Sequence, residues 1–226
     1  QCPNTFLTSQ GATETCVTHA GLSRCWYTFV AAAAANATSR VPLVVDLHGY
    51  GACASSPWPY TGWRRMADSN GFVVVWPQGT FSLAGYSNSN PSWNAGRCCG
   101  SAANTNSGAN ISDVGFLRTL VTTTRSTYDT TIDPSRVYFA GHSNGCMMAQ
   151  RMAVAASDLV AAVGCHSGWL MTGSTGSATP SAPTGYVPRS VMVVTGLSDP
   201  VVPYAQSNYW PGGLHNMQMW ATLNSC

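Results

Sequence analysis

The stretch that decides the fold is Arg136-Val137-Tyr138-Phe139-Ala140, which runs directly into Gly141-His142-Ser143-Asn144-Gly145. The first five residues predict a buried strand, and residues 146–156 predict a helix directly after the turn. A serine on so sharp a strand-to-helix turn has strained backbone angles, and the flanking glycines keep other side chains away from its hydroxyl. This G-x-S-x-G pattern predicts that Ser143 is an exposed nucleophile; the alternative is an ordinary glycine-rich turn.

The rest of the chain repeats one pattern, a short apolar strand followed by a polar loop and a segment with helical spacing. Further strands are predicted at residues 41–47, 71–76, 161–164 and 190–194, and a helix at residues 111–128. This order predicts a single α/β domain over residues 1–226, with a mostly parallel central sheet and helices on both faces. Ligands of such sheets gather at the carboxyl ends of the strands, and the Ser-, Asn- and Gly-rich loop 81–110 is long enough to overhang that edge.

The composition argues against several classes of partner. With 226 residues, 45% of them hydrophobic, the chain is able to bury one sizeable core. No apolar run reaches the roughly 18 residues that a bilayer crossing needs, so no membrane partner is expected. Only 8% of the residues are charged, and the formal net charge of +2 forms no basic stripe, so no nucleic-acid partner is expected either.

Nine cysteines point to an oxidising compartment. They form no C-x-x-C pairs and have no histidines at zinc spacing, so we expect disulfides and no metal. The start Gln1-Cys2-Pro3 is typical of a mature end left after signal removal, and Asn36 and Asn110 each begin a glycosylation sequon. We therefore expect a secreted, extracellular glycoprotein. Because nine is odd, one cysteine is left over.

Two segments are suited to support chemistry at Ser143. The backbone N–H of Asn144 is one natural donor to an oxyanion, and the N–H of Tyr50 is expected to be the other. Tyr50 belongs to His48-Gly49-Tyr50-Gly51, where the glycines permit a close approach. His48 is therefore interpreted as a residue that braces this loop, and a plain glycine turn is the alternative.

Asp199 is the candidate acid. It follows the predicted strand 190–194 and comes after Ser143 in the chain, which is the order expected of a nucleophile on a strand-to-helix turn. Its role would be to orient and stabilise a protonated imidazole. The alternative is an aspartate that caps a turn.

At this point the sequence resembles a group of extracellular esterases that includes feruloyl esterases, acetylxylan esterases and short-chain polyhydroxybutyrate depolymerases. The resemblance covers roughly residues 40–226. It rests on His48 to Gly51, Trp76-Pro77-Gln78-Gly79-Thr80, Ser92-Trp93-Asn94-Ala95-Gly96 with Cys98-Cys99-Gly100, Asp113-Val114-Gly115-Phe116-Leu117-Arg118, Gly141 to Gly145, and Asp199-Pro200-Val201-Val202-Pro203-Tyr204. It implies an α/β-hydrolase fold, no cofactor, and ester substrates attached to polymers.

The catalytic base is not evident among the five histidines. His19, His48, His142 and His166 are poorly placed by chain order or setting, and only His215 follows Asp199. His215 belongs to a segment with helical spacing that resembles the family helix preceding the last strand and the catalytic histidine. Either His215 is the base, or the base lies beyond Cys226 and this chain lacks the last strand. In the second case the leftover cysteine would link a C-terminal fragment by a disulfide. The alternative is a free buried thiol, for which Cys165 is the candidate.

Aromatic residues cluster in the loops expected around the site, at positions 58, 60, 93, 169, 204 and 210. We expect Trp93, Trp169 and His166 to line a flat-walled acyl pocket, although any single aromatic is more often core packing. The interpretation is a secreted serine carboxylic-ester hydrolase of Ser-His-Asp type, most similar to a feruloyl (cinnamoyl) esterase. The alternatives are a polyhydroxybutyrate depolymerase-like polyester hydrolase, a peptidase of similar fold, and a non-catalytic module that binds a polysaccharide or ester.

Overall fold

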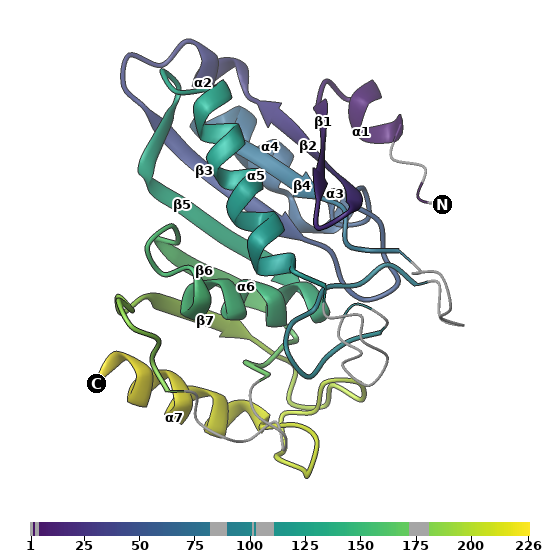
Figure 1. Cartoon of the computed structure of the whole chain (residues 1–226), viewed down its shortest axis with the longest axis vertical. Helices are drawn as coiled ribbons and strands as arrows, with labels where there is room; N and C mark the ends of the chain where they lie inside the picture. Colours follow the sequence, from purple (N-terminus) through teal and green to yellow (C-terminus); the bar gives the residue numbers. More distant parts are fainter. Residues whose placement is uncertain (1, 3–4, 82–89, 101, 103–110, 172–180) are drawn as a thin grey trace.

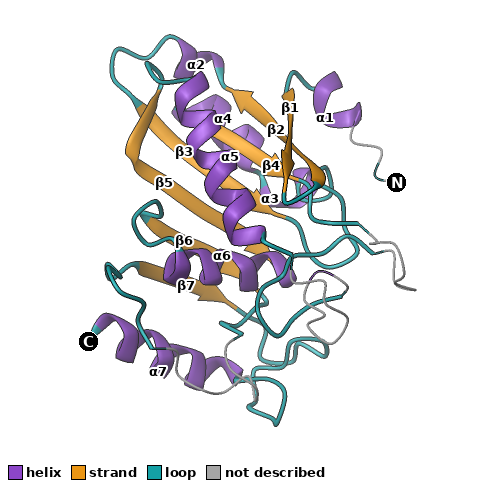
Figure 2. Cartoon of the chain, viewed as in Figure 1, coloured by secondary structure: helices purple, strands orange, loops and turns teal. Residues whose placement is uncertain are grey.

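The computed structural model describes residues 2, 5–81, 90–100, 102, 111–171 and 181–226. They form a sheet of seven strands in the order β1-β2-β4-β3-β5-β6-β7 (Figures 1 and 2). The strands are β1 (Thr13–His19), β2 (Leu22–Val30), β3 (Val41–Leu47), β4 (Val73–Pro77), β5 (Ile132–His142), β6 (Ala162–His166) and β7 (Ser190–Val194). From β4 through β3, β5 and β6 to β7 the neighbours are parallel, whereas β1–β2 and β2–β4 are antiparallel. The expected mostly parallel sheet is confirmed, with an unexpected antiparallel hairpin at one edge.

Helices cover both faces of this sheet, as expected. They are α1 (Thr5–Ser9), α2 (Ala32–Ala35), α3 (Trp58–Thr61), α4 (Trp63–Asn70), α5 (Asp113–Thr127), α6 (Asn144–Ala155) and α7 (Gly212–Asn224). In Figure 1, α5 and α6 lie in front of the sheet and α4 lies behind it. None of the helices that the structure describes has the length and apolar character needed to cross a membrane.

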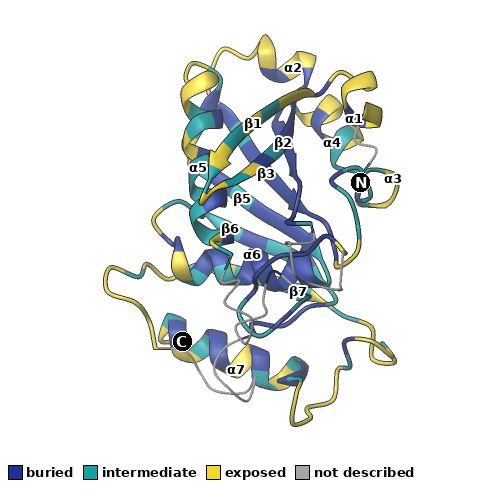
Figure 3. Ribbon diagram, turned by 45° about the vertical axis from the view of Figure 1, so that its right-hand side comes forward, coloured by how far each residue is buried: buried dark blue, intermediate teal, exposed yellow. Residues whose placement is uncertain are grey.

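The core lies along the central strands, and β7 is markedly less covered. Every residue of β4 is buried, as expected of a strand packed on both faces. In β7, by contrast, the side chains of Met192 and Val194 are 64% and 58% exposed. Figure 3 shows the buried centre of the sheet and, beyond β7, the helix α7. Helix α7 is tied to α6 by a hydrogen bond from Trp220 Nε1 to Gln150 Oε1 of 2.8 Å.

Four disulfides account for eight of the nine cysteines, all of which lie in the described part of the chain. The pairs are Cys2–Cys53, Cys16–Cys25, Cys98–Cys99 and Cys146–Cys165. The expectation of disulfides is therefore confirmed. The leftover thiol is Cys226, which is exposed, so the idea that Cys165 is a free buried thiol was wrong. Of the two sequons, Asn36 is exposed after α2, while Asn110 lies outside the described residues.

Candidate active site

Ser143 occupies a strained turn between β5 and α6. Its backbone angles are φ 53° and ψ −120°, in a region that residues with a side chain rarely adopt. Both neighbouring glycines are required by close backbone contacts. A Cβ on Gly141 would stand 2.6 Å from the carbonyl carbon of Gly145, and a Cβ on Gly145 would stand 2.6 Å from the carbonyl oxygen of His48. The turn therefore has the geometry that the G-x-S-x-G pattern predicted, and Ser143 remains partly exposed.

Asn144 anchors the start of α6 to the segment around Trp93. Its side chain is fully buried; Oδ1 accepts the Trp93 N–H at 2.7 Å, and Nδ2 donates to the Trp93 carbonyl at 3.0 Å. The backbone N–H of Asn144 stands in the first turn of the helix, where N–H groups have no partner within the helix and favour negative charge. This is the position that the sequence analysis assigned to one oxyanion donor.

The loop carrying Tyr50 lies against the serine turn. A Cβ on Gly49 would stand 3.3 Å from Nδ1 of His142 and 3.5 Å from Cβ of Ser143, so Gly49 lies directly against the serine turn. Gly51 N–H donates to the Pro91 carbonyl at 2.8 Å, which fixes the far side of Tyr50. The structure thus brings the candidate oxyanion loop next to the candidate nucleophile.

His48 braces this loop from inside the protein. Its side chain is fully buried, its Nε2 accepts the Gly79 N–H at 2.9 Å, and its Nδ1 lies 2.8 Å from the Gly49 carbonyl. Burial lowers the pKa of His48 to about 4. A neutral imidazole with both nitrogens engaged has the bracing role that we inferred from the sequence.

The two tryptophans expected to line an acyl pocket lie in the interior. Trp93 is 0% exposed and donates its indole N–H to the His48 carbonyl at 2.9 Å. Trp169 is 2% exposed and donates to the Pro203 carbonyl at 3.2 Å. Because both side chains are buried, neither ring offers an accessible surface to a substrate, and each indole N–H instead donates to a backbone carbonyl. This corrects the expectation that the two rings line an acyl pocket.

Asp199 follows β7 and is held mainly by its own turn. Its Oδ1 accepts the N–H groups of Val201 and Val202, each at 2.9 Å. These two bonds, with smaller contributions from Ser167 and from His142, lower the pKa of Asp199. The carboxylate is therefore ionised at neutral pH. Asp199 therefore caps its turn, and the same hydrogen bonds keep its carboxylate negatively charged, as a catalytic role would require.

A stacked pair of imidazoles, which the sequence analysis did not foresee, lies at the same edge. His142 and His166 are register partners at the ends of β5 and β6, with ring centroids 4.5 Å apart. Burial lowers the pKa of both; at His142 the neighbouring His166 lowers it further, while Asp199 raises it. Two His-Ser dipeptides at the carboxyl ends of strands, 142–143 and 166–167, are the signal in the sequence that would have indicated the pair.

His215 lies in the first turn of α7, which confirms the expected helical setting of that residue. The next residue, Asn216, is buried and accepts the Leu170 N–H at 2.7 Å, which docks this end of α7 on the segment after β6. The structure thus brings Ser143, Asn144, the Tyr50 loop, His166 and Asp199 to one edge of the sheet.

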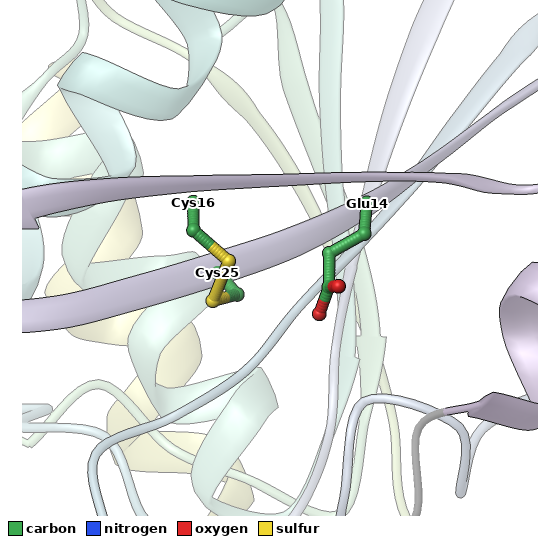
Figure 4. Close-up of side chains that lie close together, drawn as sticks. All are labelled: Glu14, Cys16 and Cys25. Carbon is green, nitrogen blue, oxygen red and sulfur yellow. A yellow bond between two sulfur atoms is a disulfide. The ribbon is translucent and has the colours of Figure 1, made fainter.

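Within the described residues, one group of three side chains has the spacing of a metal site, but its donor atoms do not suit a metal ion. Glu14, Cys16 and Cys25 place their ligand atoms within 4.8 Å of one another (Figure 4). The two sulfur atoms form a cross-strand disulfide between β1 and β2, so they are not thiolate ligands. Only the carboxylate of Glu14 remains as a donor.

A mostly parallel sheet, with a strained serine turn between a central strand and its helix, defines an α/β-hydrolase. The chain belongs to the family described as Esterase PHB depolymerase, whose sequence profile matches residues 22–204. It is 29% identical over 150 residues to a poly(3-hydroxybutyrate) depolymerase of Ralstonia pickettii, which covers 66% of this chain and 26% of that protein. It is also 29% identical over 133 residues to a probable acetylxylan esterase A of Aspergillus fumigatus, which covers 59% and 32%. The chain thus spans about a quarter to a third of the length of these relatives.

Solved structures confirm the fold. The acetyl xylan esterase from Aspergillus awamori superposes with a TM-score of 0.52 at 24% identity, covering 70% of this chain and 52% of that one. The native form of a protein named sOPH gives 0.62 at 18% identity, covering 93% and 75%. A ferulic acid esterase gives 0.51 at 17% identity, covering 71% and 61%. At these identities the likeness concerns the fold alone.

Proposed function

We propose that this chain is a serine hydrolase of carboxylic esters carried on a polymer. The observation that carries the proposal is the Ser143 turn, whose positive φ is maintained by two glycines that close contacts require. Membership of an esterase family supports the reaction class, and the relatives named for polyhydroxybutyrate and acetylxylan support a polymeric substrate.

In the proposed reaction Ser143 Oγ attacks the ester carbonyl, and a base removes the hydroxyl proton. The negative charge of the tetrahedral intermediate is stabilised by the N–H groups of Tyr50 and Asn144. Collapse expels the alcohol, which takes the proton back from the base, and water then releases the acid by the same steps. Asp199, ionised in its turn, would orient the base and stabilise its protonated form.

For the base we keep the two candidates of the sequence analysis and favour a histidine beyond Cys226. Support comes from β7, which is the edge strand of the described sheet, and from the free thiol of Cys226. A further strand beside β7 would end at the edge that carries Asp199 and Ser143. His215 is the alternative.

Intact mass before and after reduction, with the activity of His215→Ala, separates these candidates. Release of a histidine-containing peptide on reduction, with activity retained in H215A, would support a base outside residues 1–226. An unchanged mass of 226 residues, with activity abolished in H215A, would assign the base to His215.

For the ester itself we propose a feruloyl (cinnamoyl) group, with hydroxybutyrate polyester as the alternative. The aromatic surface accessible near the serine comes from tyrosines: Tyr60 is 52% exposed and meets the His142 ring edge-on, and Tyr50 is 39% exposed. Flat rings suit a cinnamoyl group. Rates on a feruloylated xylo-oligosaccharide, acetylated xylan and polyhydroxybutyrate would rank the three substrates. The four disulfides also favour a secreted protein, which detection in culture medium would test.

The reaction class is tested by hydrolysis of a small chromogenic ester, with Ser143→Ala as the control. We expect turnover by the wild type and loss of at least about a thousandfold in S143A. Equal rates for the two proteins would overturn the proposal and favour a non-catalytic binding module. A chromogenic amide tests the peptidase alternative, and we expect it to be left intact.

A further inference from the structure

A hollow lies beside the N-terminal hairpin, apart from the residues that surround Ser143. It has a volume of about 420 Å³, within the range of roughly 300–1,000 Å³ usual for ligand pockets. Its walls come from α1, from β1 and β2, and from residues 78–81 after β4. Gly79 belongs to this wall and also donates its N–H to His48, so the hollow and the serine site share one brace.

Two buried polar groups in the wall lack a hydrogen-bond partner among the described residues. Arg24 is 3% exposed; its Nη2 is paired with Asp113 at 2.6 Å, and its Nε has no partner. The hydroxyl of Thr80, which is 6% exposed, has none either. Because an unpaired buried polar group is destabilising, these two side chains favour a ligand with polar atoms.

The charges in the wall favour a neutral ligand that donates hydrogen bonds. Asp113 neutralises Arg24, so the net charge comes from the exposed carboxylate of Glu14. Glu14 accepts the Tyr27 hydroxyl at 2.5 Å through Oε1, and Oε2 can accept from a ligand. An anion would be repelled by Glu14. A polyester offers carbonyl oxygens but almost no donors, whereas a sugar offers both donors and acceptors.

The remaining wall suits the same ligand. The hydroxyl-bearing residues Thr5, Thr8 and Ser23 face it together with Leu22 and the partly exposed ring of Phe81. A pyranose ring presents hydroxyls at its edge and C–H groups on its faces, which matches a wall of mixed hydroxyl and apolar groups.

We propose that this hollow is a binding site for neutral sugar residues of a polysaccharide, holding the polymer while its ester is hydrolysed at Ser143. The inference deepens the proposed function and rests on it for the ester-bearing polymer. It selects a polysaccharide over a polyester as the substrate class. In this proposal Glu14, Thr80 and Arg24 bind the sugar residues and take no part in the reaction at Ser143.

The test is calorimetric titration of xylohexaose, a neutral unesterified probe, into Ser143→Ala protein. We expect saturable binding that weakens about tenfold in the Glu14→Ala background and several-fold with Thr80→Val, an isosteric change that removes only the hydroxyl. Thr13→Val, on β1 but outside the hollow, serves as the matched control and should bind like the parent.

The absence of binding at millimolar xylohexaose would overturn the inference, as would E14A and T80V variants that bind it as tightly as the parent protein. Tighter binding of a galacturonate oligomer or of a hydroxybutyrate trimer than of xylohexaose would also overturn it. Because the probe carries no ester, the result does not depend on catalysis. Binding that is lost in E14A, together with esterase rates equal in wild type and S143A, would refute the proposed function and leave the sugar site standing.

Discussion

The serine turn and the segment that carries Asp199 share one edge of the sheet but are held in different ways. Around Ser143, the side chains of His48, Trp93 and Asn144 are all 0% exposed and hydrogen-bond to backbone groups 31–51 residues away in the chain. Asp199 accepts its two strongest hydrogen bonds from Val201 and Val202 of its own turn and a weaker one from Ser167, and its neighbours Leu197 and Val201 are 79% and 70% exposed. The tertiary fold therefore positions the nucleophile, whereas the acid depends mainly on the local geometry of its own turn.

Substitution of Gly145 should break the first region most severely. In Gly145→Ala the new Cβ would overlap the Leu47 carbonyl oxygen and stand 2.6 Å from that of His48. Backbone cannot yield as a flexible side chain does, so we expect a loss of at least about 3 kcal/mol in the free energy of unfolding and no measurable esterase activity. Urea unfolding checks the prediction. The control is Gly164→Ala on β6, where the nearest atom is Met192 Cε at 3.7 Å and the change should stay within about 1 kcal/mol.

Removal of the Asn144 side chain should come next. Asn144→Ala leaves the buried N–H of Trp93 without its acceptor, which we expect to cost about 2–3 kcal/mol. Asn70→Ala removes an exposed amide that bonds one carbonyl of its own helix and should cost less than about 0.5 kcal/mol. Similar losses for the two variants in urea unfolding would mean that Asn144 does not anchor the turn.

Two buried titratable residues, Asp46 and His48, predict that the free energy of unfolding depends on pH. Asp46 is 1% exposed, and burial raises its pKa to about 7. Between about pH 4 and pH 7 the folded protein therefore keeps a proton that an unfolded aspartate releases, so the free energy of unfolding falls as the pH rises through this range. His48, with its pKa lowered to about 4, acts in the opposite direction. Its contribution is complete above pH 6.5 and is lost as pH falls toward 4. The two slopes oppose each other between pH 4 and 6.5.

Asp46→Asn should therefore leave the pH dependence of His48 unopposed. We expect the free energy of unfolding of D46N to fall relative to wild type by on the order of 1 kcal/mol per pH unit as pH drops from 6.5 to 4.5. Urea titrations at three pH values measure the slope. Parallel profiles for the two proteins would show that Asp46 is not protonated in the folded state.

Asp199 should show the smallest effect on stability. In Asp199→Asn the amide oxygen can still accept from Val201 and Val202, so we expect a change within about 0.5 kcal/mol, with an activity loss of about a thousandfold or more. Asp68→Asn, at an exposed pair with Arg64, should alter neither quantity. A strongly destabilised D199N would contradict the distinction between the two regions.

Apolar runs and turn chemistry were sufficient to predict the parallel strands and the serine turn. The run Val73 to Trp76 has no other favourable environment than a sheet covered on both faces. The hairpin of β1 and β2 was missed because its turn, Ala20-Gly21, has positive φ at both residues and lacks the Asn-Gly or Asp-Gly signal usual for such turns.

The side-chain environment of the site was less predictable. Trp93 looked like a pocket residue because it sits in a polar loop, yet its partner is a carbonyl 45 residues away. The pairing of His142 with His166 depends on the register of β5 and β6, which neither segment specifies alone. Tertiary contacts decide which loop residues turn inward, and local sequence does not encode them.

The most direct test of the central claim, that Ser143 is the nucleophile, is peptide mass analysis after reaction with an alkyl fluorophosphonate. Trypsin cleaves after Arg136 and Arg151, so Ser143 lies in the peptide of residues 137–151. We expect one phosphonyl group per chain, on Ser143 of this peptide, and none in Ser143→Ala. A label on another peptide, or wild-type protein left unlabelled, would contradict the account.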